Sequence, residues 1–293
     1  MTGHVLTIMN MKGGVGKTTV AANVGAAVGV WDLGVPNKKR RKVLLIDYDP
    51  QFNLSQTFLP ASTYFDLEKK RKHSLAILRD DETTVNPFVL QVPASAKPPK
   101  VVDVAQAIWE WPSGSIVHLV PSTLDLMFVA LGEPNKRVDA IEQRFASFIA
   151  EARTQYDLVV IDCHPAGSIL TKTSLRNSDH VLIPVAPEAY AVRGIGLMMR
   201  FVEASRAGHS STVTPNILFN RVPRTGTTPD EARIRADSKV GKYCMTSTLK
   251  RYAAFAEPHE GKGFVWWSGK SYSAQAKANL QVVAEELVTR LGL

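Results

Sequence analysis

The sequence predicts an α/β protein with a doubly wound, mostly parallel sheet that carries helices on both faces. Two observations lead to this class. Several short apolar runs lack polar–apolar alternation, which is typical of parallel strands buried on both sides. Helical segments separate these runs, and strands that alternate with helices along a chain of this length indicate βαβ units.

The expected strands follow one another at residues 5–9, 43–46, 158–161, 181–185 and 216–219. A glycine-rich loop comes directly after the first strand. Residues 18–30 are small and apolar, which favours a helix packed closely on the sheet, and further helices are expected at 138–155 and 194–207. Because polar residues cluster where the strands end, we expect the ligand site at the carboxyl edge of the sheet.

Two regions interrupt this rhythm. Residues 36–42 form a basic run, which we interpret as a solvated turn before the second strand. Residues 60–115 are less regular and contain several prolines and two tryptophans. The strands on either side of them belong to one sheet, so we expect a single domain over residues 1–293 with an elaborated insertion at about 60–115.

Composition narrows the class of protein. Lys and Arg number 35 against 27 Asp and Glu, a formal charge of +8, which makes a polyanionic partner plausible. The chain has 2 cysteines, too few for a disulfide framework or a zinc site within one chain. Without a signal peptide or an apolar stretch of about 18 residues, a cytoplasmic protein is expected.

The segment from Gly13 to Thr19 has the composition and context of a phosphate-binding P-loop. Glycines allow backbone N–H groups to turn toward phosphate oxygens, and the following helix adds its positive amino end. Lys17 is expected to reach the β- and γ-phosphates, and Thr18 to ligate Mg²⁺. The alternative is a tight glycine turn. We therefore expect a P-loop NTPase, with the loop itself as the nucleotide-binding element: Gly13, Gly14, Val15, Gly16, Lys17, Thr18 and Thr19.

The loop resembles the deviant Walker A motif of the ParA/MinD family, because Lys12 precedes its glycines. The resemblance covers residues 4–58 and 117–293. It includes the Asp-x-Asp-Pro-Gln segment at 47–51, the strand-ending Asp162 and the segment at 184–188. His164 and Cys163 depart from the family pattern after Asp162; two adjacent residues do not easily chelate one ion, so a buried cysteine and a loop histidine are favoured.

The resemblance implies a role for each matched residue. Lys12 would contact the nucleotide of a partner chain, as a catalytic cation delivered across a dimer interface. Asp49 would orient or activate the attacking water, while Asp47 and Asp162 would support Mg²⁺ and the phosphates. Asn220 would read the adenine edge, although an Asx turn is the alternative. ATP and Mg²⁺ are the implied cofactors.

ParA-type members of this family form ATP-bound homodimers that bind DNA nonspecifically, and a partner protein of the ParB kind stimulates hydrolysis and release. The resemblance thus implies partition or positioning of plasmid, chromosomal or other cargo, on the nucleoid when ATP is bound. A basic segment fits this function, although a solvated basic face is the alternative. Its residues are Arg221, Arg224, Arg233, Arg235, Lys239, Lys242, Lys250 and Arg251.

Other classes were weighed against this one. A MinD-like membrane-associated ATPase needs a basic amphipathic tail, but residues 279–293 contain one basic residue and are expected to pack on the core, without stable membrane association. An iron–sulfur relative needs cysteines at the dimer seam, and Cys244 has no such context. A metabolic P-loop enzyme of the same superfamily stays open.

Overall fold

The computed structural model describes residues 2–31, 41–79, 97–112, 114–131, 138–165, 167–188, 191–205, 213–256 and 263–293. Its centre is an eight-stranded sheet in the order β3-β4-β2-β5-β1-β6-β7-β8, parallel except where β3 pairs with β4. The predicted doubly wound α/β class is confirmed. The strands are β1 His4–Ile8, β2 Lys42–Tyr48, β3 Gln106–Glu110, β4 Ile116–Val120, β5 Leu158–Cys163, β6 His180–Val185, β7 Thr214–Val222 and β8 Leu249–Lys250.

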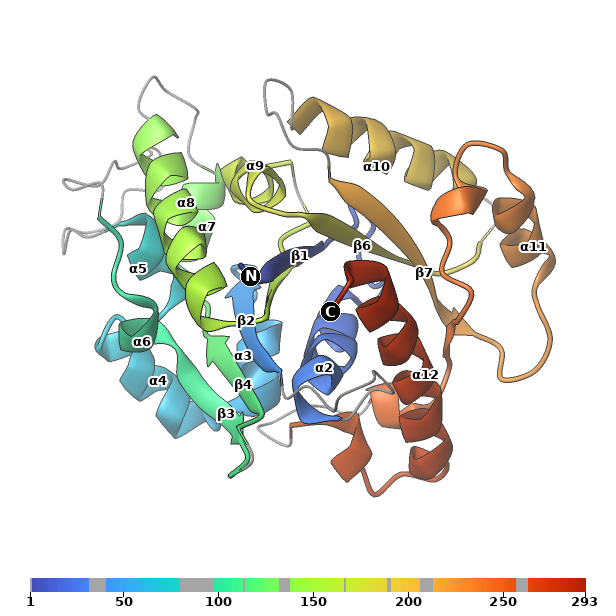
Figure 1. Ribbon diagram of the computed structural model, residues 1–293, viewed down its shortest axis with the longest axis horizontal. Helices are drawn as coiled ribbons and strands as arrows, with labels where there is room; N and C mark the ends of the chain where they lie inside the picture. The colour runs from blue at the N-terminus through green and yellow to red at the C-terminus, as the bar shows by residue number, and fades with distance from the viewer. Residues whose placement is uncertain are drawn as a thin grey trace.

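Helices cover both faces of the sheet (Figure 1). The longer ones are α4 Ala61–Lys69, α8 Val138–Gln155, α9 Ile169–Arg176, α10 Ala191–Ser205, α11 Pro229–Ala236 and α12 Ser273–Leu291. The shorter ones are α1 Lys17–Val20, α2 Ala26–Val30, α3 Asn53–Phe58, α5 Ser74–Leu78, α6 Val101–Val104 and α7 Leu126–Leu131. A π-helical segment η1 spans Ala21–Gly25, and 3-10 turns η2, η3 and η4 span Gly241–Tyr243, Ala253–Ala256 and Val265–Trp267.

Alternate residues of the central strands build two separate cores. In β2, Leu44 and Ile46 pack with α8, α9 and α10, whereas Val43 and Leu45 pack with η1, α2 and α12. Both sets are fully buried, and this explains why the strand has no polar alternation. The strand therefore lies between two helical layers, as its sequence predicted.

The helix after the glycine-rich loop runs continuously from α1 through η1 to α2. Asn23, in the π-helical segment, donates to the Thr19 carbonyl at 3.0 Å and accepts from the backbone N–H of Val265 at 2.9 Å. Gly25 and Gly29 let the helix approach the sheet: a Cβ on Gly29 would lie 2.8 Å from a Val117 methyl group. The expectation of a closely packed small-residue helix is confirmed.

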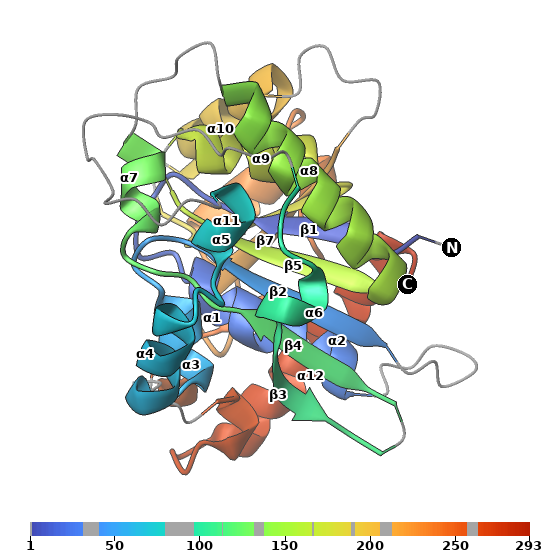
Figure 2. The same cartoon turned by 90° about the vertical axis from the view of Figure 1, so that its left-hand side faces the viewer.

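Residues 60–115 contribute regular structure where the sequence indicated irregularity. Their described part forms α4, α5, α6 and the edge strand β3, which pairs with β4 (Figure 2). Arg144 of α8 fastens this part to the body of the protein, because its buried guanidinium donates to the carbonyls of Ala76 and Ile77, each at 2.9 Å. The strands β3, β4 and β8 were not predicted.

The basic run before β2 lies mostly outside the described residues. Within it, Arg41 is 2% exposed and Lys42 is exposed. The prediction of a wholly solvated turn is therefore wrong for Arg41, which is buried directly before the first residue of β2.

The carboxyl-terminal helix α12 packs on the core as expected. Its apolar stripe is buried against η1 and α2, in the core on that face of the sheet. Within the described residues, none of the helices combines the length and apolarity that crossing a bilayer requires. The stripe consists of Ala276, Leu280, Val283, Ala284, Leu287, Val288 and Leu291.

Candidate functional site

The carboxyl ends of three adjacent strands bring the predicted site residues together. In the strand register Asp162 of β5 is paired with Ile8 of β1 on one side and with Asp47 of β2 on the other. The glycine-rich loop follows β1 directly. Side chains at paired positions point to the same face of a sheet, so Asp47 and Asp162 lie side by side next to this loop.

The loop has the backbone conformation that a phosphate cradle requires. Gly14 and Gly16 have φ angles of 71° and 86°, a region that side-chain-bearing residues rarely adopt. Gly16 also packs against Asn220, where a Cβ would lie 2.4 Å from the amide nitrogen. Lys17 and Thr18 then begin the helix, so the loop presents backbone N–H groups at a helix amino end.

Asp162 is a buried carboxyl at the base of this loop. The Thr18 hydroxyl hydrogen-bonds to it, and the nearby Lys17 ammonium favours its charged form. Burial nonetheless dominates, and together with the charge of Asp49 it raises the pKa of Asp162 to about 7. A cation placed beside Thr18 and Asp162 would relieve this cost.

Asp47 and Asp49 differ in their surroundings. Asp47 is fully buried, and one of its oxygens accepts from the Ser55 backbone N–H at 2.8 Å and from the Ser55 hydroxyl at 2.7 Å. Burial and the charge of Asp162 hold the pKa of Asp47 above its ordinary value. Asp49 is half-buried and accepts from the Gln51 backbone N–H at 3.0 Å. Asp47 thus anchors α3, while Asp49 stands closer to solvent.

Lys12 stands at the open rim of the loop. Its ammonium forms an ion pair with Glu188, which follows β6, and both side chains are more than half exposed. Asn10 shapes this rim, because its side chain accepts from the Lys12 backbone N–H at 2.9 Å and donates to the Pro184 carbonyl at 2.8 Å. The exposure of Lys12 leaves it able to change partners at little cost.

A cleft of about 1120 Å³ extends from the loop across the ends of β6, β7 and β8. Lys12, Gly13 and Gly14 line one end of it, and aromatic and basic side chains line the other. Arg224 stacks on the Tyr272 ring at 4.6 Å in this second part. The volume and lining suit a ligand with a phosphate chain at one end and a flat ring at the other.

Asn220, at the end of β7, forms part of the cleft floor. Its amide donates to the Val15 carbonyl at 2.8 Å, and its oxygen accepts from the Arg221 backbone N–H at 2.8 Å. One N–H and one lone pair are left beyond these bonds. The structure therefore gives Asn220 a role in shaping the loop, while its contact with adenine stays a prediction.

The basic segment of the sequence separates into two groups. The first group lines the cleft, and three of its four members are exposed: Arg221, Arg224 and Arg251, with Lys250 half-buried beside them. Since they lie beside the phosphate loop, their field acts on anything bound there. Contact of these residues with DNA stays a prediction.

The second group lies on and after α11. Arg233 pairs with Asp230 at 2.8 Å, and Arg235 pairs with Glu231 at 2.9 Å. Arg235 also donates to the Met245 carbonyl at 2.7 Å, which gives it a structural role. Lys239 and Lys242 are exposed and do not line the cleft.

Several cleft residues were missed by sequence reasoning. Glu188 lies in a segment that the sequence did single out, but nothing there indicated its pairing with Lys12. Tyr252, Phe255 and Tyr272 belong to no motif in the sequence, and only the fold brings them to the cleft that the loop also lines. The expectation for Cys163 is confirmed, since it is fully buried and burial raises its pKa to about 12.

The described residues contain no cluster of three or more His, Cys, Asp or Glu side chains suited to a metal ion. A divalent cation in this site would therefore depend on the Thr18 hydroxyl, the Asp162 carboxylate and oxygens brought by the ligand itself. That requirement fits Mg²⁺, which keeps several waters and is held by few carboxylates plus phosphates.

Comparison with known proteins places this geometry in a family. A family model described as an AAA domain matches residues 3–213. The chromosome-partitioning ATPase Soj of Treponema pallidum is 28% identical over 99% of both chains, and the chromosome partitioning protein ParA of Caulobacter vibrioides is 28% identical over 98% of this chain and 94% of its own.

Solved structures share the fold. A plasmid partition protein of Borrelia burgdorferi bound to AMPPNP has a TM-score of 0.66 at 20% identity, over 97% of this chain and 98% of its own. The pNOB8 ParA bound to nonspecific DNA has a TM-score of 0.61 at 20% identity, over 99% of both chains. The chain belongs to the AAA-domain family of the matched model, and it is a P-loop ATPase of the ParA/Soj partition type.

Proposed function

We propose that this protein is an ATP-dependent dimerising switch that binds DNA nonspecifically and partitions or positions a DNA or other cargo. The exposed Lys12 at the rim of a phosphate loop is the observation that carries this proposal. A cation whose partner in the described part of the chain is an exposed carboxylate can leave it for a γ-phosphate in a partner chain. Hydrolysis then depends on two chains closing together.

The chemistry follows from the residues around the loop. Lys17 would neutralise charge on the β- and γ-phosphates, and Thr18 with Asp162 would hold Mg²⁺. When bound, Mg²⁺ supplies charge stabilisation of the phosphate oxygens. Asp49 is the half-buried carboxylate closest to solvent, and it orients the attacking water; Asp47 fixes α3 and supports the shell from behind.

The DNA-binding surface is assigned to the basic rim of the cleft. Arg221, Arg224 and Arg251 are exposed and free to approach a phosphate backbone, whereas Arg235 is engaged within the fold. Because these arginines share the cleft with Lys12, closure around ATP would arrange the rims of two chains together. Two aligned basic rims contact more phosphates than one, so ATP would raise DNA affinity.

A partner of the ParB kind would stimulate hydrolysis and reset the switch, and the ATP-bound state would reside on the nucleoid. The membrane-associated alternative is not favoured, because the apolar stripe of α12 is already buried in the core.

DNA binding measured with and without nucleotide tests the proposal. Fluorescence anisotropy with a labelled duplex of unrelated sequence is expected to show tight binding in ATP and at least tenfold weaker binding in ADP or without nucleotide. Lys17→Ala is expected to abolish the difference, because the loop loses its phosphate contact. Lys70→Ala, directly after α4 and outside both the cleft and the basic segment, serves as the control for loss of one positive charge. Binding that is equal in ATP and ADP would leave an ATPase without this switch.

A further inference from the structure

The outer edge of the sheet at β8 is satisfied by side chains of α12. Among the described residues, β8 pairs with β7 alone and stands last in the sheet. Asn279 of α12 donates to the Thr248 carbonyl at 2.8 Å and accepts from the Lys250 backbone N–H at 2.8 Å. One amide thus makes the pair of hydrogen bonds that a neighbouring strand would make.

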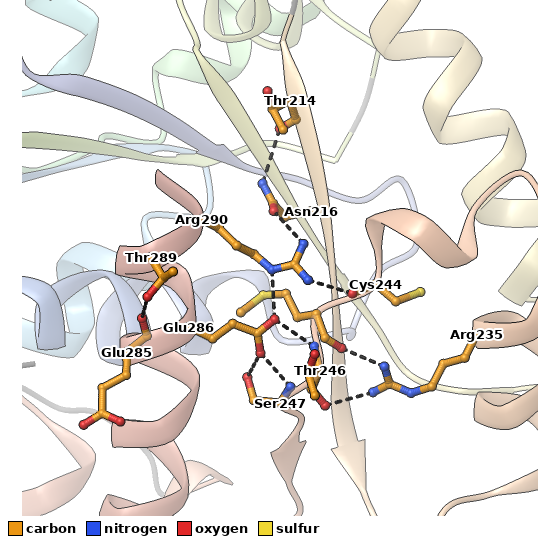
Figure 3. Close-up of polar contacts among 11 residues, drawn as sticks. Thr214, Asn216, Arg235, Cys244, Thr246, Ser247, Glu285, Glu286, Thr289 and Arg290 are labelled. Atoms are coloured by element: carbon orange, nitrogen blue, oxygen red, sulfur yellow. Dashed lines mark hydrogen bonds and ion pairs between the residues drawn. The ribbon is translucent and has the colours of Figure 1, made fainter. Parts of the chain in front are cut away.

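The residues before β8 are held by a second group on α12 (Figure 3). Glu286 accepts from the backbone N–H groups of Thr246 at 2.8 Å and Ser247 at 2.6 Å, and from the Ser247 hydroxyl at 2.6 Å. Arg290 binds the same carboxylate at 2.8 Å and donates to the Cys244 carbonyl at 2.8 Å. Three donors from this segment on one carboxylate, which Arg290 holds in place, fix both the position and the direction of this backbone.

A third contact reaches the segment from the opposite side. Arg235 of α11 donates to the Met245 carbonyl at 2.7 Å, and its guanidinium stacks on the Phe219 ring of β7 at 4.8 Å. The backbone from Cys244 to Lys250 is therefore gripped between two helices. Its backbone is also bonded to β7, since the Met245 N–H donates to the Ile217 carbonyl at 2.8 Å and β8 pairs with Asn220 and Val222, so the helices hold the side of the segment that faces away from β7.

This gripped segment leads directly into the cleft. Lys250 is its last residue, Arg251 and Tyr252 follow directly, and all three line the cleft opposite the phosphate loop. We propose that Asn279 and Glu286 are positioning residues that set the distance of this wall from the phosphate loop, and with it the affinity for nucleotide and for DNA. The proposal rests on the proposed function, because it takes the basic rim as the ligand-binding wall.

The two residues act on binding and not on the chemical step. Lys17, Asp49 and Asp162 lie on or directly after β1, β2 and β5, whereas the gripped segment pairs with β7, whose Asn220 is bonded to the Val15 carbonyl of the loop. If this wall is held less firmly, a smaller fraction of the molecules has it in the position that binds ATP. The apparent affinity for ATP then falls in proportion to that fraction. Once ATP is bound, the reacting groups are unchanged. The expected signature is a raised KM with an unchanged kcat.

The test compares Glu286→Gln with Glu285→Gln, a matched control on the next residue. The Glu285 carboxylate accepts from Gln281 in the same helix at 3.1 Å, so Glu285→Gln removes the same charge without touching the gripped segment. In Glu286→Gln the KM for ATP is expected to rise about threefold to tenfold with kcat within twofold. The slope of DNA affinity against salt is expected to fall by about one, since Arg251 keeps its backbone bond to the Val222 carbonyl but loses the support of α12 through the segment before it. Equal KM values and salt slopes in the two variants would overturn the proposal.

Asn279→Leu gives an independent reading, because it removes both bonds to β8 and leaves the Glu286 contacts in place. It is expected to raise the KM in the same way. A fall in melting temperature with an unchanged KM would show a purely structural role and would overturn the proposal.

Arg251→Ala separates a failure of the proposed function from a failure of the positioning role. If this variant leaves DNA affinity unchanged, the assignment of DNA binding to the basic rim fails, and the positioning role fails with it. If Arg251→Ala weakens DNA binding while both α12 variants do not, the positioning role alone fails.

Discussion

At the scale of single residues, the site buries a carboxyl group whose charged form destabilises the folded protein. Asp162 is buried beside Asp47, and its pKa of about 7 lies well above the ordinary value for Asp. The folded protein therefore binds more protons than the unfolded chain between about pH 4 and 7, so this group lowers stability as pH rises through that range. A cation held by this carboxylate, as proposed, would offset the cost.

Asp162→Asn is expected to stabilise the nucleotide-free protein and to weaken its function. At pH 8 the free energy of unfolding should rise by about 2 to 4 kcal/mol, since the buried charge is removed. Binding of ATP with Mg²⁺ should fall at least tenfold. Urea unfolding of both proteins at pH 5 and pH 8 measures the first effect, which should be larger at pH 8. A variant less stable than the wild type at pH 8 would mean that Asp162 stabilises the fold.

At the scale of elements, the helix after the loop is positioned by its closest glycine. A Cβ on Gly29 would meet a Val117 methyl group at 2.8 Å and the Ile116 carbonyl oxygen at 3.0 Å. Gly29→Ala is expected to lower the free energy of unfolding by about 1 to 3 kcal/mol, because the helix must move away from β2 and β4.

Gly196 of α10 provides the control for this substitution. Its Cβ would have no neighbour within 4 Å, so Gly196→Ala should stabilise the protein by about 0.5 to 1 kcal/mol through helix propensity. Chemical denaturation of both variants checks the pair. Equal effects of the same sign would contradict the close approach at Gly29.

The buried elements could be predicted from the sequence, and the edge elements could not. β1, β2, β5, β6 and β7 are covered on both faces and have continuous apolar runs. In β4 the run is broken by His118, which is held by Tyr156 at 2.7 Å and Glu110 at 3.0 Å. β8 has two residues, and the distant Asn279 fixes its position. No local signal encodes such contacts.

The same division applies to the site. The loop and the neighbouring Asp47 and Asp162 follow from motif and strand register, and the structure brings them together. The partner of Lys12 lies 176 residues away in the chain, at Glu188, and the cleft wall at Tyr252 depends on α12. A sequence states which residues carry the chemistry of the phosphates, but long-range packing decides what surrounds them.

At the scale of the whole molecule, one cleft joins the phosphate loop, the exposed Lys12 and the basic rim. The sheet fixes the phosphate loop, and α12 holds the wall that carries the basic rim. A ligand that closes two chains over this cleft would change the partner of Lys12 and the position of both rims in a single event. This arrangement explains how nucleotide state could control a DNA-binding surface without a separate domain.

The central claim is that ATP turns this chain into a two-chain state, and molar mass in solution tests it most directly. Asp49→Ala should hold ATP without rapid turnover, so light scattering is best done on this variant. We expect about 32.1 kDa without nucleotide or with ADP and twice that mass with ATP and Mg²⁺. Adding Lys12→Ala should shift the ATP-bound sample back toward the monomer. A mass that is the same in ATP, in ADP and without nucleotide would contradict the claim.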